Sequence, residues 1–196
     1  ASLNPEDYQY QPMPTERIAP ELMQGALHKL KEVFPSLAVV FEDSRFAGFF
    51  WAKYMASAAG ILKVGEEYIF ILNEELKERL SNLTPESVTL FLYLLAVHEA
   101  VEFALQLQGA LPYINTEIAS ELQTIQAYSI LTPEERSSLI VLFEGLEEEQ
   151  FKTRYLLVIG LYNRIVNNKL SREDAAETIK IFISQYPKKL DGKQFQ

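Results

Sequence analysis

Three ionisable side chains near the middle of the chain have the types and the spacing of a metal site. His98, Glu99 and Glu102 lie in the stretch Leu95–Phe103, whose other residues are all apolar. Residues four apart share one face of a helix, so His98 and Glu102 can both reach one divalent ion. Glu99 is rotated by about 100° from His98 on an ideal helix, which places it beside such an ion, where a general base is needed.

The next predicted helix supplies candidates for a third ligand. It carries Glu117 and Glu121, again four residues apart, and Asn115 or Thr116 can cap its start. One or both glutamates are expected to point back at His98. The candidate metal ligands are therefore His98, Glu102, Glu117 and Glu121, and the candidate catalytic residue is Glu99.

The helix around His98 is expected to lie in the core. Thr84-Pro85-Glu86 has proline in the first helical position, and the helix is predicted to run to about Gln108. Its apolar stretch Val88–Leu107 is about long enough to cross a bilayer, but the ionisable residues in its middle would be costly in lipid. A helix that is apolar nearly all round is buried, so we expect no membrane span.

A buried cluster of this kind needs a counter-charge. Buried carboxylates require an ion, a cationic side chain or shared protons, and residues 80–132 contain no lysine or arginine. This favours a metal or a protonated carboxyl pair. The alternative is that the motif arises by chance in a glutamate-rich helical protein and that Glu99 and Glu102 are solvated.

Composition bounds the remaining possibilities. The 196 residues fit one domain, 48% of them are hydrophobic, and cysteine is absent. A net charge of −9 argues against nucleic acid or an anionic membrane as the main partner. We expect an acidic, soluble, cytoplasmic protein because no signal peptide is visible, although the initial Ala1 is compatible with a removed one. His28 is the only other histidine and is expected at the surface.

The first half of the chain predicts a small sheet packed on helices. Residues 1–15 contain three prolines and are expected to form an extended arm before a core of residues 16–130. The apolar spacing of Pro20–Phe34 indicates a helix. The predicted strands, which make a sheet of three to four strands over about residues 37–72, are Leu37–Phe41, Phe46–Met55 and the hairpin of residues 60–64 and 67–72.

The last third of the chain predicts helices only. They cover residues 133–150, 151–168 and 171–186, and residues 131–196 are expected to form a C-terminal helical extension. Thr132 and Ser171 stand at N-cap positions. The fold class is therefore α+β and mostly helical. The amphipathic C-terminal helices fit homo-oligomerisation as well as core packing.

Three stretches in this order carry a resemblance to a known family. Tyr68–Asn73 looks like an edge strand that binds substrate backbone, Leu94–Glu99 matches the first half of an HExxH signature, and Asn115–Glu121 is similar to a ligand helix. Together they resemble the minimal core of zincin metallopeptidases of the gluzincin type over roughly residues 20–128. Glu102 stands where that family has its second histidine.

The resemblance implies a role for each candidate. His98 would be a ligand, Glu99 the general base, Glu117 the third ligand and Glu121 the acceptor that orients His98. Glu117 and Glu121 exchange roles if the connecting loop is tighter than assumed. The activity implied is that of a metal-dependent peptidase whose peptide substrate pairs with the Tyr68–Asn73 strand. The candidates for stabilising an oxyanion are Tyr113, Tyr128 and Asn115.

The glutamate at position 102 changes the expected metal chemistry. One neutral histidine and two carboxylates carry more negative charge than the two histidines and one glutamate of a typical zincin site. The water on a zinc ion should therefore be less acidic here. Oxygen ligands also shift the preference from Zn²⁺ toward harder ions such as Mn²⁺, Fe²⁺ or Mg²⁺. The rival hypothesis is a catalytically inactive zincin-like or helical protein. It would act as a structural or protein–protein interaction module through the acidic helices of residues 133–186.

Overall fold

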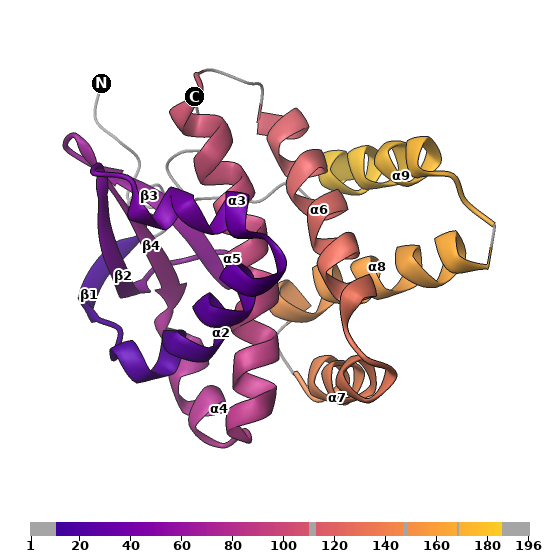
Figure 1. The fold of residues 1–196 in the computed structure, drawn as a ribbon, viewed down its shortest axis with the longest axis horizontal. Coiled ribbons are helices and arrows are strands. Elements are labelled where there is room, and N and C mark those ends of the chain that lie inside the picture. The colour runs from indigo at the N-terminus through magenta and orange to yellow at the C-terminus, as the bar shows by residue number, and fades with distance from the viewer. Residues whose placement is uncertain (1–10, 110–112, 147–148, 168, 186–196) are drawn as a thin grey trace.

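The computed structural model describes residues 11–109, 113–146, 149–167 and 169–185. It has the mostly helical α+β architecture predicted from the sequence. A sheet lies on one side of the molecule, α5 (Pro85–Leu107) runs through the middle, and the C-terminal helices lie on the other side (Figure 1).

The sheet is mixed and has four strands in the described residues. β1 (Met13–Arg17), β2 (Phe46–Lys53), β3 (Ala59–Val64) and β4 (Glu67–Asn73) lie in the order β1-β2-β4-β3. β2 and β4 are parallel, and the other two pairs are antiparallel. The β3–β4 hairpin turns at Gly65, whose φ of 63° suits glycine. This hairpin confirms the sequence prediction.

Tyr68–Asn73 is an interior strand, so the expectation of an edge strand there was wrong. Tyr68 of β4 lies opposite Phe46 of β2 on one side and opposite Lys63 of β3 on the other. Neighbouring strands therefore occupy the backbone groups on both sides of β4. The edges of the sheet are β1 and β3, and β3 lies against α5.

The strand predicted at Leu37–Phe41 was also wrong. This segment forms α3 (Pro35–Ala38) and the 3₁₀ turn η1 (Val39–Glu42). Pro35 occupies the first position of α3, where its fixed φ favours a helix. Phe41 then packs on the rings of Phe46 and Phe103, with centroid distances of 5.1 and 6.4 Å. These contacts override the β propensity of the segment.

The fourth strand of the sheet, β1, comes partly from the segment that was predicted to be an extended N-terminal arm. The described end of that arm contributes to β1, which pairs with β2 at the edge of the sheet, whereas residues 1–10 lie outside the described residues. Pro14 is tolerated because an edge strand has one side without partners, and the pairing is irregular between Pro14 and Glu16. The sheet therefore begins at residue 13 and not near residue 37.

The predicted helices are confirmed, with shifts at two ends. Neither Asn115 nor Thr116 is a cap because their helix already begins at Tyr113, and the helix after Thr132 ends before Gly145 rather than near residue 150. The expected caps Thr132 and Ser171 accept hydrogen bonds from backbone N–H groups, and Thr84 and Asn73 do the same. The remaining elements are α2 (Pro20–Val33), η2 (Glu74–Leu76), α4 (Lys77–Ser81), α6 (Tyr113–Ile130), α7 (Pro133–Glu144), α8 (Glu149–Val166) and α9 (Arg172–Gln185).

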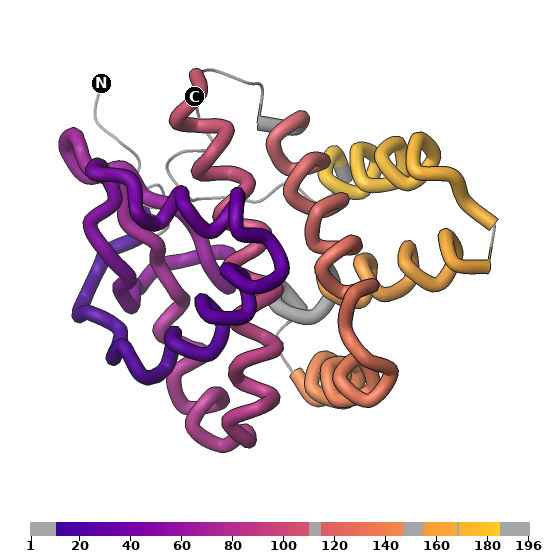
Figure 2. The backbone as a smooth tube through the Cα atoms, viewed as in Figure 1, coloured from indigo at the N-terminus to yellow at the C-terminus, as the bar shows by residue number. Residues whose placement is uncertain are grey.

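α5 is the central element of the core. It contacts α2 and β3 toward the sheet, and α6 and α7 toward the C-terminal half (Figure 2). By length and composition it is the one described helix that could cross a membrane, yet most of it is buried inside the protein. Its apolar residues join the main hydrophobic cluster from both halves. The His98 motif therefore lies deep in the fold, as predicted.

Candidate metal centre

The candidate centre lies between α5 and α6, which pack against each other (Figure 1). α5 contributes His98, Glu99 and Glu102, and α6 contributes Glu117 and Glu121. The exposed fraction of these five residues ranges from 0 to 6%. All five site residues named from the sequence are thus buried and brought together. The alternative hypothesis, in which Glu99 and Glu102 are exposed to solvent, was therefore wrong.

The Nε2 atom of His98 faces three carboxylates. The nearest oxygens of Glu102, Glu117 and Glu99 lie 3.4, 3.6 and 3.8 Å from it. Among the described residues, this buried nitrogen lies within ion-pair distance of all three carboxylates but makes no hydrogen bond of good geometry. A positive charge at this nitrogen, either a proton or a metal ion, would satisfy the arrangement.

The other ring nitrogen of His98 is held by α6. Nδ1 lies 2.8 Å from Oε1 of Glu121, a hydrogen-bonding distance at which Nδ1–H donates to the carboxylate. A hydrogen bond at one ring nitrogen fixes the tautomer and orients the other nitrogen for a metal. Glu121 therefore has the geometry of the orienting acceptor that the resemblance implies, with Glu117 on the Nε2 side.

The electrostatic environment favours a cation at His98. Burial is the largest influence and lowers the pKa of His98, but the carboxylates of Glu117, Glu99, Glu121 and Glu102 together outweigh it. The pKa therefore lies well above its ordinary value of 6.5. The four carboxylates thus favour a positive charge at this imidazole, which either a proton or a divalent ion would supply.

The donor set fits a divalent ion. Histidine nitrogen and carboxylate oxygen bind Zn²⁺ at about 2.0–2.2 Å, so two donors on one tetrahedral ion are separated by about 3.4 Å. The separations from Nε2 to Glu102 and Glu117 are 3.4 and 3.6 Å. The described residues contain two groups of three whose ligand atoms all lie within 4.8 Å of one another, His98/Glu117/Glu121 and His98/Glu99/Glu102. Either group could hold a metal ion.

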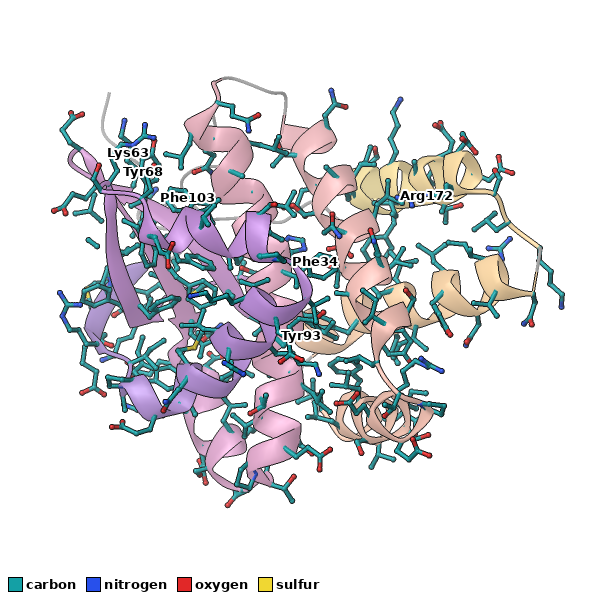
Figure 3. All side chains as sticks on the ribbon, viewed as in Figure 1. Phe34, Lys63, Tyr68, Tyr93, Phe103 and Arg172 are labelled. Atoms are coloured by element: carbon teal, nitrogen blue, oxygen red, sulfur yellow. The ribbon has the colours of Figure 1, made fainter. Side chains whose placement is uncertain are left out.

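Contacts at both ends of α5 support the helix that carries His98. At its start, Thr84 Oγ1 accepts a hydrogen bond from the N–H of Ser87 at 3.2 Å. Near its end, the Phe103 ring packs on Tyr68 of β4 at a centroid distance of 5.2 Å (Figure 3). The cap satisfies one backbone N–H at the start of α5, and the ring contact ties the end of this helix to the sheet, so the site residues on α5 have a rigid support.

Of the three oxyanion candidates, the structure describes the side chains of two. Asn115 is exposed, and the side chain of Tyr113 lies outside the described residues. Tyr128 is buried and packs on Tyr162 of α8, with a centroid distance of 5.1 Å. His28 lies on the surface next to Glu32, as expected, with 81% of its side chain exposed.

Two further buried hydroxyl groups were missed by the sequence analysis. Among the described residues, Ser120 Oγ and Tyr93 Oη have no hydrogen-bond partner. Ser120 lies between the two glutamates of α6, and Tyr93 lies on the side of α5 that faces α2 (Figure 3). Burial raises the pKa of Tyr93, which keeps its phenol neutral. No motif or spacing in the sequence distinguishes either residue.

The chain matches no protein-family model, no curated protein and no solved structure. The zincin resemblance therefore depends on the residues of this chain alone.

Proposed function

We propose that the protein is a divalent-metal-dependent hydrolase with peptides as its substrate class. The observation that carries this proposal is the buried Nε2 atom of His98, which faces three carboxylates and lacks a hydrogen-bond partner among the described residues. A preformed group of nitrogen and oxygen donors with an oriented imidazole is the arrangement that metal centres require.

Each residue has a role in the proposal. His98 Nε2, Glu102 and Glu117 hold the ion, and Glu121 orients the imidazole through Nδ1. Glu99, next to His98 on α5, accepts the proton of the attacking water. A divalent ion in this position supplies Lewis acidity and lowers the pKa of water. Compared with a site of two histidines and one glutamate, this oxygen-rich donor set shifts the preference toward harder ions such as Mn²⁺ or Fe²⁺.

The substrate class follows from the zincin resemblance and from the sheet. Because β4 is interior, a peptide could pair only with β1 or β3, and of these edges β3 lies against the site helix. The proposed docking strand is therefore β3, Ala59–Val64, in place of Tyr68–Asn73.

A non-catalytic metal protein is the second candidate. It is favoured by the burial of the site, because even the most exposed of the five residues, His98, is only 6% exposed. A hydrolase has to admit water and substrate, whereas a structural metal site is closed. This candidate predicts the same metal content without turnover.

The deciding experiment is elemental analysis of protein purified without chelator or metal resin, followed by peptidase assays with the metal found. His98→Ala should lose the metal, while His28→Ala, which changes the exposed histidine of α2, should keep it. Stoichiometric metal in the wild type with turnover that Glu99→Gln abolishes supports the hydrolase. Metal without turnover favours the second candidate, and no metal with an intact fold refutes both.

A further inference from the structure

The burial of α5 changes one turn after His98. Every residue from 91 to 100 is buried, and Val101 is the first residue after this run that is partly exposed. On the helix face that carries the histidine, Leu94 is 0% exposed, whereas Val101 and Leu105 are partly exposed. His98 therefore lies at the boundary between the buried middle of α5 and its more open C-terminal end.

The edge strand β3 is exposed near the same end of α5. Phe103 packs on Tyr68 of β4 at a centroid distance of 5.2 Å, and Tyr68 lies opposite Lys63 of β3 (Figure 3). The first three residues of β3 are buried, but Lys63 and Val64 are exposed. The exposed half of the proposed docking strand is thus tied to the part of α5 that directly follows Val101.

We propose that water and small ligands reach the candidate centre from the C-terminal end of α5 and that Val101 controls their entry. Val101 follows His98 by three residues, so the two side chains are neighbours on the helix surface. A valine in a helix has one strongly preferred rotamer, so its methyl groups form a fixed obstacle. The inference rests on the site of the proposed function, whose five residues are at most 6% exposed.

The approach to His98 from the other direction along α5 is closed by packing. Leu94 and Leu95, which precede the histidine by about one turn, are 0 and 2% exposed. Protein interiors contain few voids larger than a water molecule, so a ligand from that side would have to displace core side chains. Val101 is already in contact with solvent. The side chain at position 101 therefore limits the size of a ligand that enters.

The two histidines of the chain allow a direct test. Diethyl pyrocarbonate modifies imidazole nitrogens, and peptide mass spectrometry of metal-free protein gives the rate at each histidine. His28, with 81% of its side chain exposed, is the internal reference. The rate at His98 is compared in the wild type, Val101→Ala and Val97→Ala. Val97→Ala is the matched control, because Val97 is a valine next to His98 in the chain that is 0% exposed.

We expect Val101→Ala to speed the modification of His98 about tenfold, which corresponds to about 1.4 kcal/mol. Val97→Ala should leave this rate close to that of the wild type, and His28 should react equally in all three proteins. Denaturant unfolding of each variant shows whether a faster reaction follows lower stability, because unfolding exposes His98 as well. An unchanged rate in Val101→Ala, or an equal acceleration in Val97→Ala, overturns the inference.

The histidine rates do not depend on a metal ion, so the inference and the proposed function fail separately. If the protein binds no metal, the proposed function fails while the rates at His98 still decide the entry route. If the protein binds metal, Val101→Ala should also speed the removal of the ion by a chelator, and Val97→Ala should not. Equal removal rates in the wild type and Val101→Ala would contradict the inference alone.

Discussion

The imidazole of His98 has a different environment at each nitrogen, and this difference defines the centre. Nδ1 lies 2.8 Å from a single carboxylate oxygen of Glu121, whereas Nε2 faces three carboxylates at 3.4–3.8 Å without a hydrogen bond to a described residue. The hydrogen bond to Glu121 places a proton on Nδ1, so Nε2 is the ring nitrogen that can bind an ion. Glu121 is therefore a positioning residue for His98.

Replacing Glu121 by alanine should weaken metal binding and destabilise the metal-free protein. Nδ1–H would lose its acceptor inside the core, which costs about 1–3 kcal/mol, and loss of such an orienting partner typically lowers metal affinity about 10–100-fold. Glu121→Gln keeps an acceptor oxygen and should recover most of both losses. Denaturant unfolding and metal titration measure them. Wild-type affinity in Glu121→Ala would show that His98 does not depend on this contact.

The spacing predicted that these five residues lie close together but not the distances between them. Two pairs, each four residues apart, place His98 and Glu102 on one face of α5 and Glu117 and Glu121 on one face of α6. The distance of Glu99 depends on its side-chain torsions and on how α5 is rotated against α6. Tertiary packing sets both, so the sequence could not reveal that a carboxylate oxygen of Glu99 lies only 3.8 Å from Nε2.

The close packing of α2 on α5 depends on a glycine. A Cβ atom at Gly25 would lie 2.6 Å from Thr89 Oγ1 and 3.2 Å from its Cγ2. Overpacking costs about 1–3 kcal/mol, and alanine's helix propensity offsets at most about 1 kcal/mol of this. Gly25→Ala should therefore lower the free energy of unfolding.

A second substitution tests the cause of that loss. Thr89→Ala removes both of the atoms that a Cβ at position 25 would meet. In a Thr89→Ala background, the change Gly25→Ala should therefore no longer lower the free energy of unfolding. Urea unfolding of the four proteins in the cycle gives the coupling. Additive effects, or a Gly25→Ala variant at least as stable as the wild type, would mean that α2 shifts freely on α5.

Helices were predicted better than strands, for reasons that particular residues show. Helix ends carry local signals, such as the hydrogen bonds to Thr84 and Thr132, and these depend only on neighbouring residues. Strand identity depends on distant partners: Met13–Arg17 is a strand because β2 lies beside it, and Leu37–Phe41 is not one because Phe41 packs among aromatic rings. Position within the sheet depends on topology, which made β4 an interior strand.

The start of α7 should show a pH-dependent stability. Thr132 and Glu135 form a capping box, and Lys29 Nζ of α2 lies 3.4 Å from Glu135 Oε2. Burial raises the pKa of Glu135, but the hydrogen bonds and charge of Thr132 and Lys29 outweigh it and hold the pKa below its ordinary value of 4.5. A lowered folded-state pKa contributes stability above the unfolded pKa, and this contribution is lost as pH falls through the folded value.

Glu135→Gln should therefore be less stable than the wild type at neutral pH, with a difference that shrinks as the pH falls below 4.5. The comparison of the two proteins at each pH cancels the titration of the buried cluster. Free energies of unfolding from denaturant curves at several pH values measure the difference. A difference that stays constant through this range would show that the Glu135 charge contributes nothing.

At the scale of the whole molecule, the centre joins the two halves of the fold. α5 belongs with the sheet and α2, whereas α6 packs on α8 and α9 (Figure 2). The five site residues lie on α5 and α6, the two helices at which these groups meet. Two of the three proposed ligands come from α5 and the third from α6. An ion here would link the halves through bonds that the unfolded chain cannot arrange, so binding should stabilise the whole fold.

Stabilisation by a bound metal ion should appear as a shift in Tm. A ligand at 100 times its Kd stabilises the folded state by about 2.7 kcal/mol, and each kcal/mol shifts the Tm of a chain of this length by about 2–4 °C. Adding Mn²⁺ or Zn²⁺ to metal-free protein should therefore raise the Tm by about 5–10 °C, and chelator should reverse the shift. His28→Ala should show the full shift, whereas His98→Ala should show none. An equal shift in both variants would place the ion elsewhere on this acidic protein, because only His98 lies at the α5–α6 contact.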